Sequence, residues 1–256
     1  MDLSSYLPQD LTLSAVVVMT VGLSIGAIAR GYSGFGFSAL LVSSWSLVTD
    51  PARAVVVALC LEVAASVMQA FSVWKDIPWK RVGLLMVGAV IGTPLGVYIL
   101  AYAPREPLKL VIAGFVLVST VLLLVGFKLK RRSGSLGTTA VGAASGVANG
   151  AVAMGGLPVA LFLTADGDTP AHIRAAVIAY FFLLDLTGLF FLTREGLVTT
   201  DTLSLVVLAI PIVALGVWLG GRQFLGSSPE AFRRTTLLLL LVIATLGIVR
   251  ALWLMA

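Results

Sequence analysis

The chain has few charged residues, one cysteine and one histidine. Only 11% of its 256 residues are Asp, Glu, Lys or Arg, which is too few to cover the surface of a soluble globule of this length. A lone Cys60 excludes an intramolecular disulfide, and His172 alone cannot build a metal site. No nucleophile with its base and no cofactor motif is visible, so we expect neither an enzyme nor a bound cofactor.

Hydrophobic residues make up 59% of the chain, and the mean hydropathy is +1.06. This composition predicts an all-α polytopic membrane protein. The net charge of +5 comes from Lys and Arg in short loops between apolar stretches, where membrane orientation explains them better than nucleic-acid binding does. The first apolar stretch, 11–29, is preceded by acidic residues and no basic ones, so we expect a retained span rather than a cleaved signal peptide.

Eight apolar stretches are long enough to cross a bilayer. They fall near 11–29, 54–73, 82–103, 108–127, 138–153, 175–192, 203–221 and 235–255. Two shorter stretches, 37–49 and 157–165, each follow a glycine-rich segment and are predicted to be half-helices. The sequence thus predicts a transmembrane repeat over 1–127, a basic linker over 128–136 and a second transmembrane repeat over 137–256.

The glycine-rich segments belong to a motif that occurs twice. The first copy comprises Gly22–Gly26, S-G-F-G-F-S (Ser33–Ser38) and D-P-A-R-A-V-V-V-A (Asp50–Ala58); the second comprises Gly142–Gly146, A-M-G-G-L-P (Ala153–Pro158) and T-P-A-H-I-R-A-A-V-I-A (Thr169–Ala179). A repeated break at membrane depth is typical of transporters built from two related halves with a binding site between them. Small-xxx-small spacing at Gly88, Gly92 and Gly96, and at Gly216 and Gly220, predicts close helix packing.

The distribution of basic residues predicts how the halves are oriented. If each broken element returns to the side from which it enters, eleven Lys and Arg lie on one side and five on the other; if both cross, the split is nine against seven. The positive-inside rule favours the first arrangement. It predicts halves of inverted topology, with both termini outside the cytoplasm.

The breaks are candidate anion sites. A helix that starts inside the membrane presents unpaired N–H groups and a partial positive charge. The candidate substrate-binding residues are Arg30, Ser33, Gly34, Phe35, Gly36 and Ser38 in the first copy, and Asn149, Met154, Gly155 and Gly156 in the second. The alternative is that these glycines only permit tight packing or a kink.

Charges at membrane depth are costly and mark function by default. Arg30 either adds charge to the anion site or reaches toward an interface. Arg53, His172 and Arg174 either guide anions at a pore mouth or meet lipid headgroups. Glu62 shares a helical face with Ser66 and Gln69. Glu62 and Asp185 are candidates either for proton coupling or for structural pairing, with Arg30 as the partner of Glu62.

Three segments resemble the paired motifs of the sulfite exporter TauE/SafE family. They are R-G-Y-S-G-F-G-F-S-A-L-L-V (Arg30–Val42), D-P-A-R-A-V-V-V-A-L-C-L-E (Asp50–Glu62) and G-A-V-A-M-G-G-L-P-V-A-L-F (Gly150–Phe162). The resemblance implies a permease of the bacterial inner membrane for sulfite, organosulfonates or related small anions, with Gly34, Gly36, Gly155 and Gly156 along the substrate path. The family motif often has three consecutive glycines, whereas here Phe35 and Phe37 interrupt the first copy and Met154 precedes only two glycines in the second.

We therefore expect a secondary transporter for a small anion, most readily sulfite or an organosulfonate moving outward, that works by alternating access. An anion channel and an uptake permease for a small carboxylate are the alternatives. The expected partners are the anionic substrate and membrane lipid, with proton coupling open. The sequence leaves the substrate, the direction of transport and the oligomeric state open.

Overall fold

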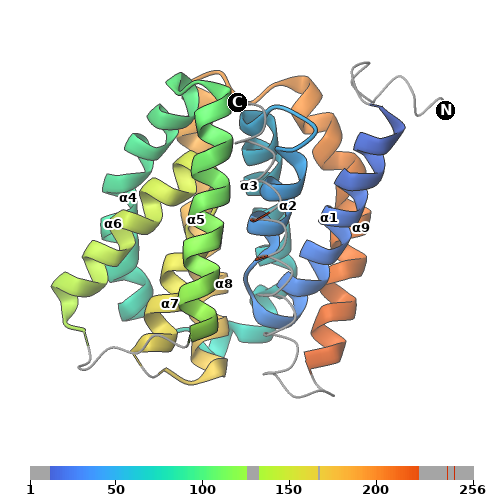
Figure 1. Cartoon of the computed structure of the whole chain (residues 1–256). Helices are drawn as coiled ribbons and strands as arrows, with labels where there is room; N and C mark the ends of the chain where they lie inside the picture. The colour runs from blue at the N-terminus through green and yellow to red at the C-terminus, as the bar shows by residue number, and fades with distance from the viewer. Residues whose placement is uncertain (1–11, 126–132, 167, 225–240, 242–244, 246–256) are drawn as a thin grey trace.

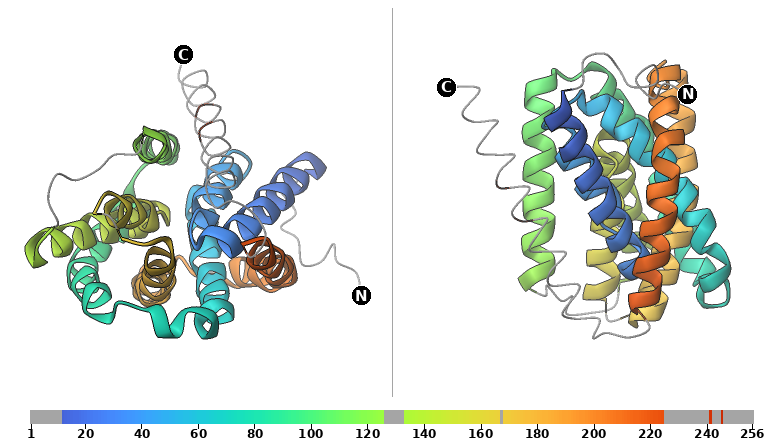
Figure 2. Two further views of the ribbon diagram at one scale, coloured as in Figure 1. Left: turned by 90° about the horizontal axis from the view of Figure 1, so that it is seen from below. Right: turned by 90° about the vertical axis from the view of Figure 1, so that its right-hand side faces the viewer.

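The computed structural model describes residues 12–125, 133–166, 168–224, 241 and 245. Within these ranges the chain is helical and contains no strand. The helices are α1 (Leu13–Ser33), α2 (Phe37–Trp45), α3 (Pro51–Val73), η2 (Trp74–Asp76), α4 (Trp79–Tyr102), α5 (Arg105–Val125), α6 (Ser135–Val152), α7 (Gly156–Ala165), α8 (Pro170–Arg194) and α9 (Thr200–Phe224). They form one bundle, with α5 along its outside (Figures 1 and 2).

Five of these helices are long and apolar enough to cross a membrane, namely α1, α3, α4, α8 and α9. This is fewer than the eight spans that the sequence predicts. Helices α5 and α6 occupy two further predicted positions, and the last predicted stretch, 235–255, lies almost wholly outside the described residues. Helix α1 also runs to Ser33, beyond the predicted end at 29, so Arg30 lies within the helix.

The predicted half-helices occur as α2 and α7. Helix α1 is followed by Gly34, whose φ of 81° is left-handed, and α2 begins after Gly36, whose φ is 92°. Glycine adopts such angles without a Cβ penalty. Helix α6 is followed by Ala153, with φ of 56°, and α7 starts at Gly156. Both apolar segments are therefore interrupted where the glycine motif predicts.

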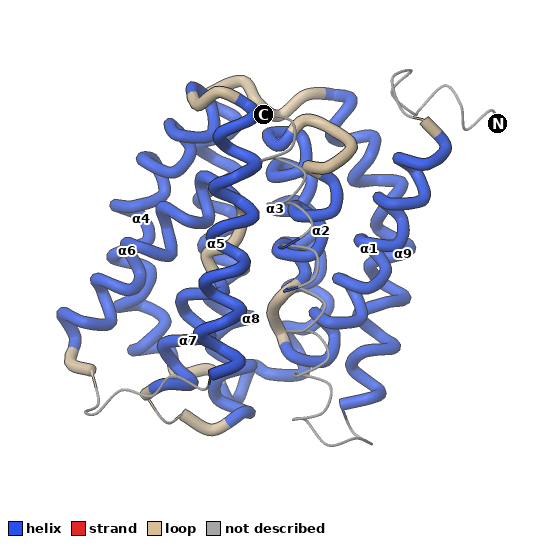
Figure 3. Tube along the Cα trace, in the orientation of Figure 1, coloured by secondary structure: helices blue, strands red, loops and turns tan. Residues whose placement is uncertain are grey.

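The two broken elements run in opposite directions. Helix α1 leads away from the end of the bundle where it begins, and α2 returns toward that end (Figures 1 and 3). Helices α6 and α7 make the same excursion from the opposite end. Three helix ends lie at the end of the bundle from which α6 enters: the last turn of α3, the first turn of α8 and the last turn of α9.

The helices that follow the half-helices start with matching caps. The Asp50 side chain accepts a hydrogen bond from the Ala52 amide at 2.8 Å, and Thr169 accepts one from the His172 amide at 3.4 Å. In both helices proline occupies the first turn, where its missing N–H costs nothing. The repeated D-P and T-P dipeptides thus fix where α3 and α8 begin.

Helices α3 and α8 pack against each other in the centre, and each broken element packs on a helix of the other predicted repeat. Helix α1 lies along α9, and α6 lies along α4. Glycines make the second contact close: a Cβ on Gly88 would lie 1.9 Å from the Thr139 carbonyl oxygen, and one on Gly92 would lie 2.1 Å from that of Ala143. The small-residue spacing therefore lets two backbones touch.

We expect Gly92→Ala to destabilise the bundle by about 1–3 kcal/mol, because the added methyl meets backbone that cannot turn away. Gly83→Ala in the same helix is the matched control, since a Cβ there meets nothing within 4 Å. Unfolding of both variants in a detergent titration measures the difference. Equal stability of the two variants would contradict this account of the α4–α6 contact.

The outer surface of the bundle is apolar. Ile91 on α4 and Val207 on α9 are 71% and 68% exposed, which suits lipid rather than water. Aromatic pairs lie near the helix ends: the Trp74 and Trp79 ring centroids are 5.2 Å apart, and those of Tyr98 and Tyr102 are 4.6 Å apart. Aromatic belts of this kind mark membrane interfaces. The chain is a multi-pass membrane protein.

Candidate functional site

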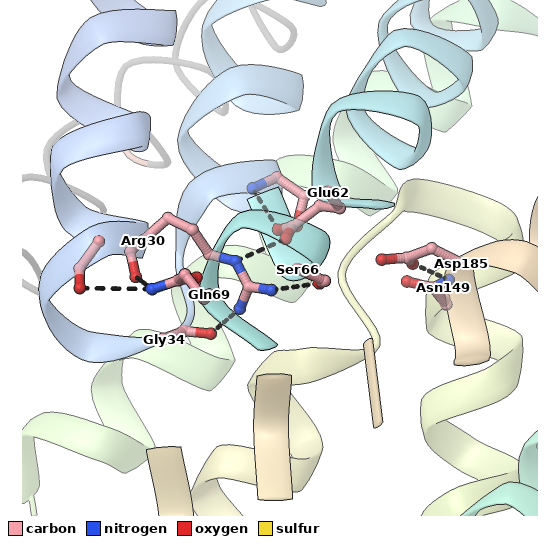
Figure 4. A network of polar contacts seen from close by, with 9 residues as sticks. Arg30, Gly34, Glu62, Ser66, Gln69, Asn149 and Asp185 are labelled. Carbon is pink, nitrogen blue, oxygen red and sulfur yellow. Dashed lines mark hydrogen bonds and ion pairs between the residues drawn. The ribbon is translucent and has the colours of Figure 1, made fainter. Parts of the chain in front are cut away.

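The interruption between α1 and α2 is the first break, and the interruption between α6 and α7 is the second. Arg30 lies in the last turn of α1, beside the first break, and is fully buried. Its Nε lies 2.9 Å from Glu62 Oε2, its Nη2 donates to Ser66 Oγ at 2.7 Å, and its Nη1 donates to the Gly34 carbonyl oxygen. Gln69 Nε2 donates to the Arg30 carbonyl oxygen at 3.3 Å (Figure 4). The predicted Arg30–Glu62 pair is confirmed, and the face formed by Glu62, Ser66 and Gln69 points at the break.

Glu62 also caps the first half-helix. Its Oε1 accepts a hydrogen bond from the Ser38 amide at 3.3 Å, and Ser38 is the second residue of α2. No side chain of the preceding loop performs this task, because the capping residue is Gly36. One of the amides expected to bind an anion is thus held by a carboxylate of the protein itself. The start of α2 attracts negative charge here, and Glu62 supplies it.

The second break is held by Asn149 and Asp185. Asn149 Oδ1 accepts from the Gly155 amide at 3.3 Å, and its Nδ2 donates to Asp185 Oδ1 at 2.8 Å. Ser145 Oγ donates to the Gly155 carbonyl oxygen at 2.5 Å, and the Tyr180 hydroxyl donates to Ser145 Oγ at 2.8 Å. Side chains of α6 therefore hydrogen-bond to both the amide and the carbonyl oxygen of Gly155. Side chains of α8 hydrogen-bond to these two α6 side chains.

Helix α8 touches both breaks. The Arg30 guanidinium lies 4.9 Å from the centroid of the Phe181 ring, a distance at which a cation and an aromatic face attract. The same ring packs on Gly156, where an added Cβ would lie 1.8 Å from Phe181 Cζ. One aromatic side chain thus contacts the cation of the first break and the first residue of α7. The two breaks are neighbours, as the duplicated motif predicts.

A cavity of about 750 Å³ opens beside the first break, between α3, α8 and α9. Gln69, Arg174 and Arg222 are among its lining residues. Arg174 Nη2 donates to the Gly31 carbonyl oxygen at 3.3 Å, and the Arg222 guanidinium lies 4.1 Å from the centroid of the Trp218 ring. Arg174 thus connects the lining of this cavity to the last turns of α1, and Arg222 packs on Trp218, another lining residue.

The other predicted site residues are distributed as follows. Phe35 and Met154 are buried within their breaks, and the side chain of Ser33 lies outside the described part of the structure. Arg53 is half-buried at the start of α3, where its Nη1 lies 3.5 Å from Thr49 Oγ1. His172 is exposed at the start of α8. Arg53 and Arg174 lie in similar motif contexts near the starts of α3 and α8, and these two helices start at opposite ends of the bundle (Figure 1).

Sequence reasoning missed three residues that hold the breaks. Ser145 lies four residues before Asn149 on α6, so an i, i+4 search of the second motif for polar pairs would have found it. Tyr180 and Phe181 lie in an uninterrupted apolar run of α8. No pattern in that run distinguishes an aromatic residue that contacts a break from one that faces lipid.

Comparison with models of protein families matches residues 18–246 to the family described as sulfite exporter TauE/SafE. Comparisons with curated proteins and with solved structures give no significant match. The matched region begins within α1 and covers both breaks and all the described helices that follow. The match agrees with the apolar spans and with the paired glycine breaks that α8 brings together. This chain therefore belongs to the sulfite exporter TauE/SafE family.

Proposed function

We propose that the protein is a secondary transporter of the bacterial inner membrane that moves a small oxyanion, sulfite or an organosulfonate, outward between the two breaks. Membership in the family supports a transporter of the sulfite and sulfonate type. The observation that carries the site is the contact of both breaks with Phe181. Because α2 and α7 both begin there, the positive ends of two helix dipoles converge on one region.

The arrangement of the elements supports two inverted repeats. Helix α1 packs on α9 while α6 packs on α4, and α3 meets α8 in the centre. This exchange is the pattern that a two-fold axis in the membrane plane produces, and the opposite directions of the two broken elements agree with it (Figure 3). A transporter of this kind alternates its access by moving one repeat against the other around a fixed site.

The bonds of Glu62 suggest how the α2 amide and Arg30 are paired when no substrate is bound. Its carboxylate carries negative charge at the α2 amide and faces Arg30 at 2.9 Å. A substrate oxyanion would make the same two kinds of contact. We infer that the substrate replaces Glu62 at the Ser38 amide during transport. The charged residues lining the cavity of about 750 Å³ are Arg174, Arg222 and Asp76, so positive charge exceeds negative charge along it. This cavity is our proposed route for the anion to the first break.

Binding of anions to the purified protein tests this proposal. Sulfite, methanesulfonate and acetate are titrated against the wild type and against Gly36→Leu. We expect sulfite or the sulfonate to bind the wild type and Gly36→Leu to lose that affinity, because a side chain at a φ of 92° distorts the start of α2.

The matched control is Gly196→Leu. Gly196 also has a positive φ, 69°, but it follows α8 and has open space around it. This variant bears similar backbone strain away from the breaks, so we expect it to keep wild-type affinity. Unchanged affinity in Gly36→Leu would show that the binding site lies elsewhere, and preference for acetate over both sulfur oxyanions would overturn the assigned substrate class.

A further inference from the structure

The two buried acids of the candidate site differ in how their charge is balanced. Glu62 faces the Arg30 guanidinium at 2.9 Å. Asp185 is 1% exposed and forms no ion pair with any residue in the described ranges. Its Oδ1 accepts one hydrogen bond from Asn149, and its Oδ2 has no hydrogen-bond partner in the described part of the chain.

A carboxylate without a counter-charge at membrane depth costs several kcal/mol, so such residues are rare and mark ion or proton pathways. Asp185 lies near the middle of α8, within the candidate span His172–Arg194. The binding of one proton at Oδ2 cancels its charge. Glu62 has no such need, because Arg30 already balances it.

The ionisable groups around Asp185 are few. Those that act on it electrostatically are Glu62 and Cys60 on α3, Arg30 on α1 and Tyr180 on α8 itself. Helices α6 and α7 contain no ionisable residue. The ionisable residues of α4 and η2 lie toward the helix ends, and they are Lys75, Asp76, Lys80, Arg81, Tyr98 and Tyr102. Glu62 adds negative charge near Asp185 rather than balancing it.

Asp185 is joined to the second break by a single residue. Asn149 Nδ2 donates to Asp185 Oδ1 at 2.8 Å (Figure 4), and Asn149 Oδ1 accepts from the Gly155 amide at 3.3 Å. A hydrogen bond to a charged carboxylate is about twice as strong as one to a neutral acid. Protonation of Asp185 therefore loosens Asn149, which is the side chain that holds the amide directly before α7.

We propose that Asp185 is the proton-binding residue of the transport cycle and acts through Asn149 on the second break. The carboxylate takes up one proton at Oδ2 and returns it as H⁺, so no other bond forms or breaks. This inference rests on the proposed transporter function. It assigns the two acids separate tasks: Glu62 holds Arg30 and the start of α2, while Asp185 couples the movement of the second break to a proton gradient.

Flux measurements in proteoliposomes test the assignment. The probe is radiolabelled methanesulfonate, because its charge stays constant when pH changes. Exchange is measured at equal pH on both sides, and net flux is measured under an imposed pH gradient. We expect the wild type to show both, and we expect Asp185→Asn to retain exchange while its net flux no longer responds to the gradient.

Two further variants make the result specific. Asp185→Glu keeps a proton-binding group and is expected to keep a response to the gradient even if Asp185→Asn folds poorly. Asp201→Asn makes the same chemical change at an exposed position in the first turn of α9 and is expected to behave as the wild type does. Retention of the gradient response in Asp185→Asn, its loss in Asp201→Asn, or its absence in the wild type overturns the assignment of Asp185.

These outcomes are distinct from a failure of the transporter function. A wild-type protein that neither binds a sulfur oxyanion nor exchanges methanesulfonate contradicts the proposed function, and the inference falls with it. A wild type that exchanges the probe without any effect of the pH gradient leaves the transporter function standing and removes only the role of Asp185.

Discussion

Replacing Glu62 by Gln is expected to lower the free energy of unfolding by about 3–5 kcal/mol, because it leaves the buried Arg30 guanidinium without a counter-charge. Gln can still accept the Ser38 hydrogen bond through its amide oxygen, so the loss reports on the ion pair at 2.9 Å rather than on the cap. Detergent-induced or thermal unfolding of the purified protein measures this loss.

Two comparisons separate the buried charge from other effects. The double variant Arg30→Gln with Glu62→Gln removes both charges and is expected to be more stable than Glu62→Gln alone. Asp50→Asn breaks the Asp50–Arg105 pair at 2.8 Å, where Arg105 is 75% exposed, and is expected to cost less than about 1 kcal/mol. If Glu62→Gln cost no more than Asp50→Asn, Arg30 would have to be balanced by another group.

Replacing Gly156 by Ala is expected to abolish transport. The added methyl would lie 1.8 Å from Phe181 Cζ, so either the ring or the start of α7 must move. The ring cannot move freely, because it also lies 4.9 Å from the Arg30 guanidinium. We expect destabilisation of about 1–3 kcal/mol from overpacking, together with loss of exchange in proteoliposomes, since the two breaks no longer fit together.

A second substitution tests the cause. Phe181→Leu in the Gly156→Ala background makes room for the methyl and is expected to restore part of the exchange activity. Gly114→Ala on α5 is the control for adding a methyl to a helix, because its Cβ meets nothing within 4 Å. Full activity in Gly156→Ala would show that contact between α7 and Phe181 is not needed for transport.

The buried acids of the two predicted halves, Glu62 and Asp185, differ in how they contact the breaks and in how their charge is balanced. In the first half, the acid of the central helix reaches the half-helix amide itself, and an arginine balances it. In the second half, Asp185 is joined to the break through Asn149 and forms no ion pair with any residue that the structure describes. In the proposed cycle, the anchoring of the first break changes when substrate replaces Glu62, and the anchoring of the second break depends on a proton.

The sequence by itself predicts that the protein is a helical membrane protein and where its two broken elements are interrupted. Apolar length and the scarcity of charge indicate a membrane protein, and the glycine motifs place the interruptions between α1 and α2 and between α6 and α7. The sequence also offers Arg30 as the candidate partner of Glu62, because an unpaired charge at membrane depth is costly. The spans and the breaks depend on hydropathy and on left-handed φ angles, which act within one helix or one loop.

Only the tertiary structure decides what the breaks contact. That Glu62 caps α2, that Phe181 touches both breaks and that Asp185 is joined to Gly155 through Asn149 all depend on how α3 and α8 rotate against each other and against the broken elements. Apart from the short polar face of α3, the apolar sequences of these helices do not mark which side meets protein and which meets lipid. Close packing at glycines and a few buried polar bonds fix that rotation instead, and some of these bonds join residues far apart in the chain, such as Arg30–Ser66 and Asn149–Asp185, each 36 residues apart.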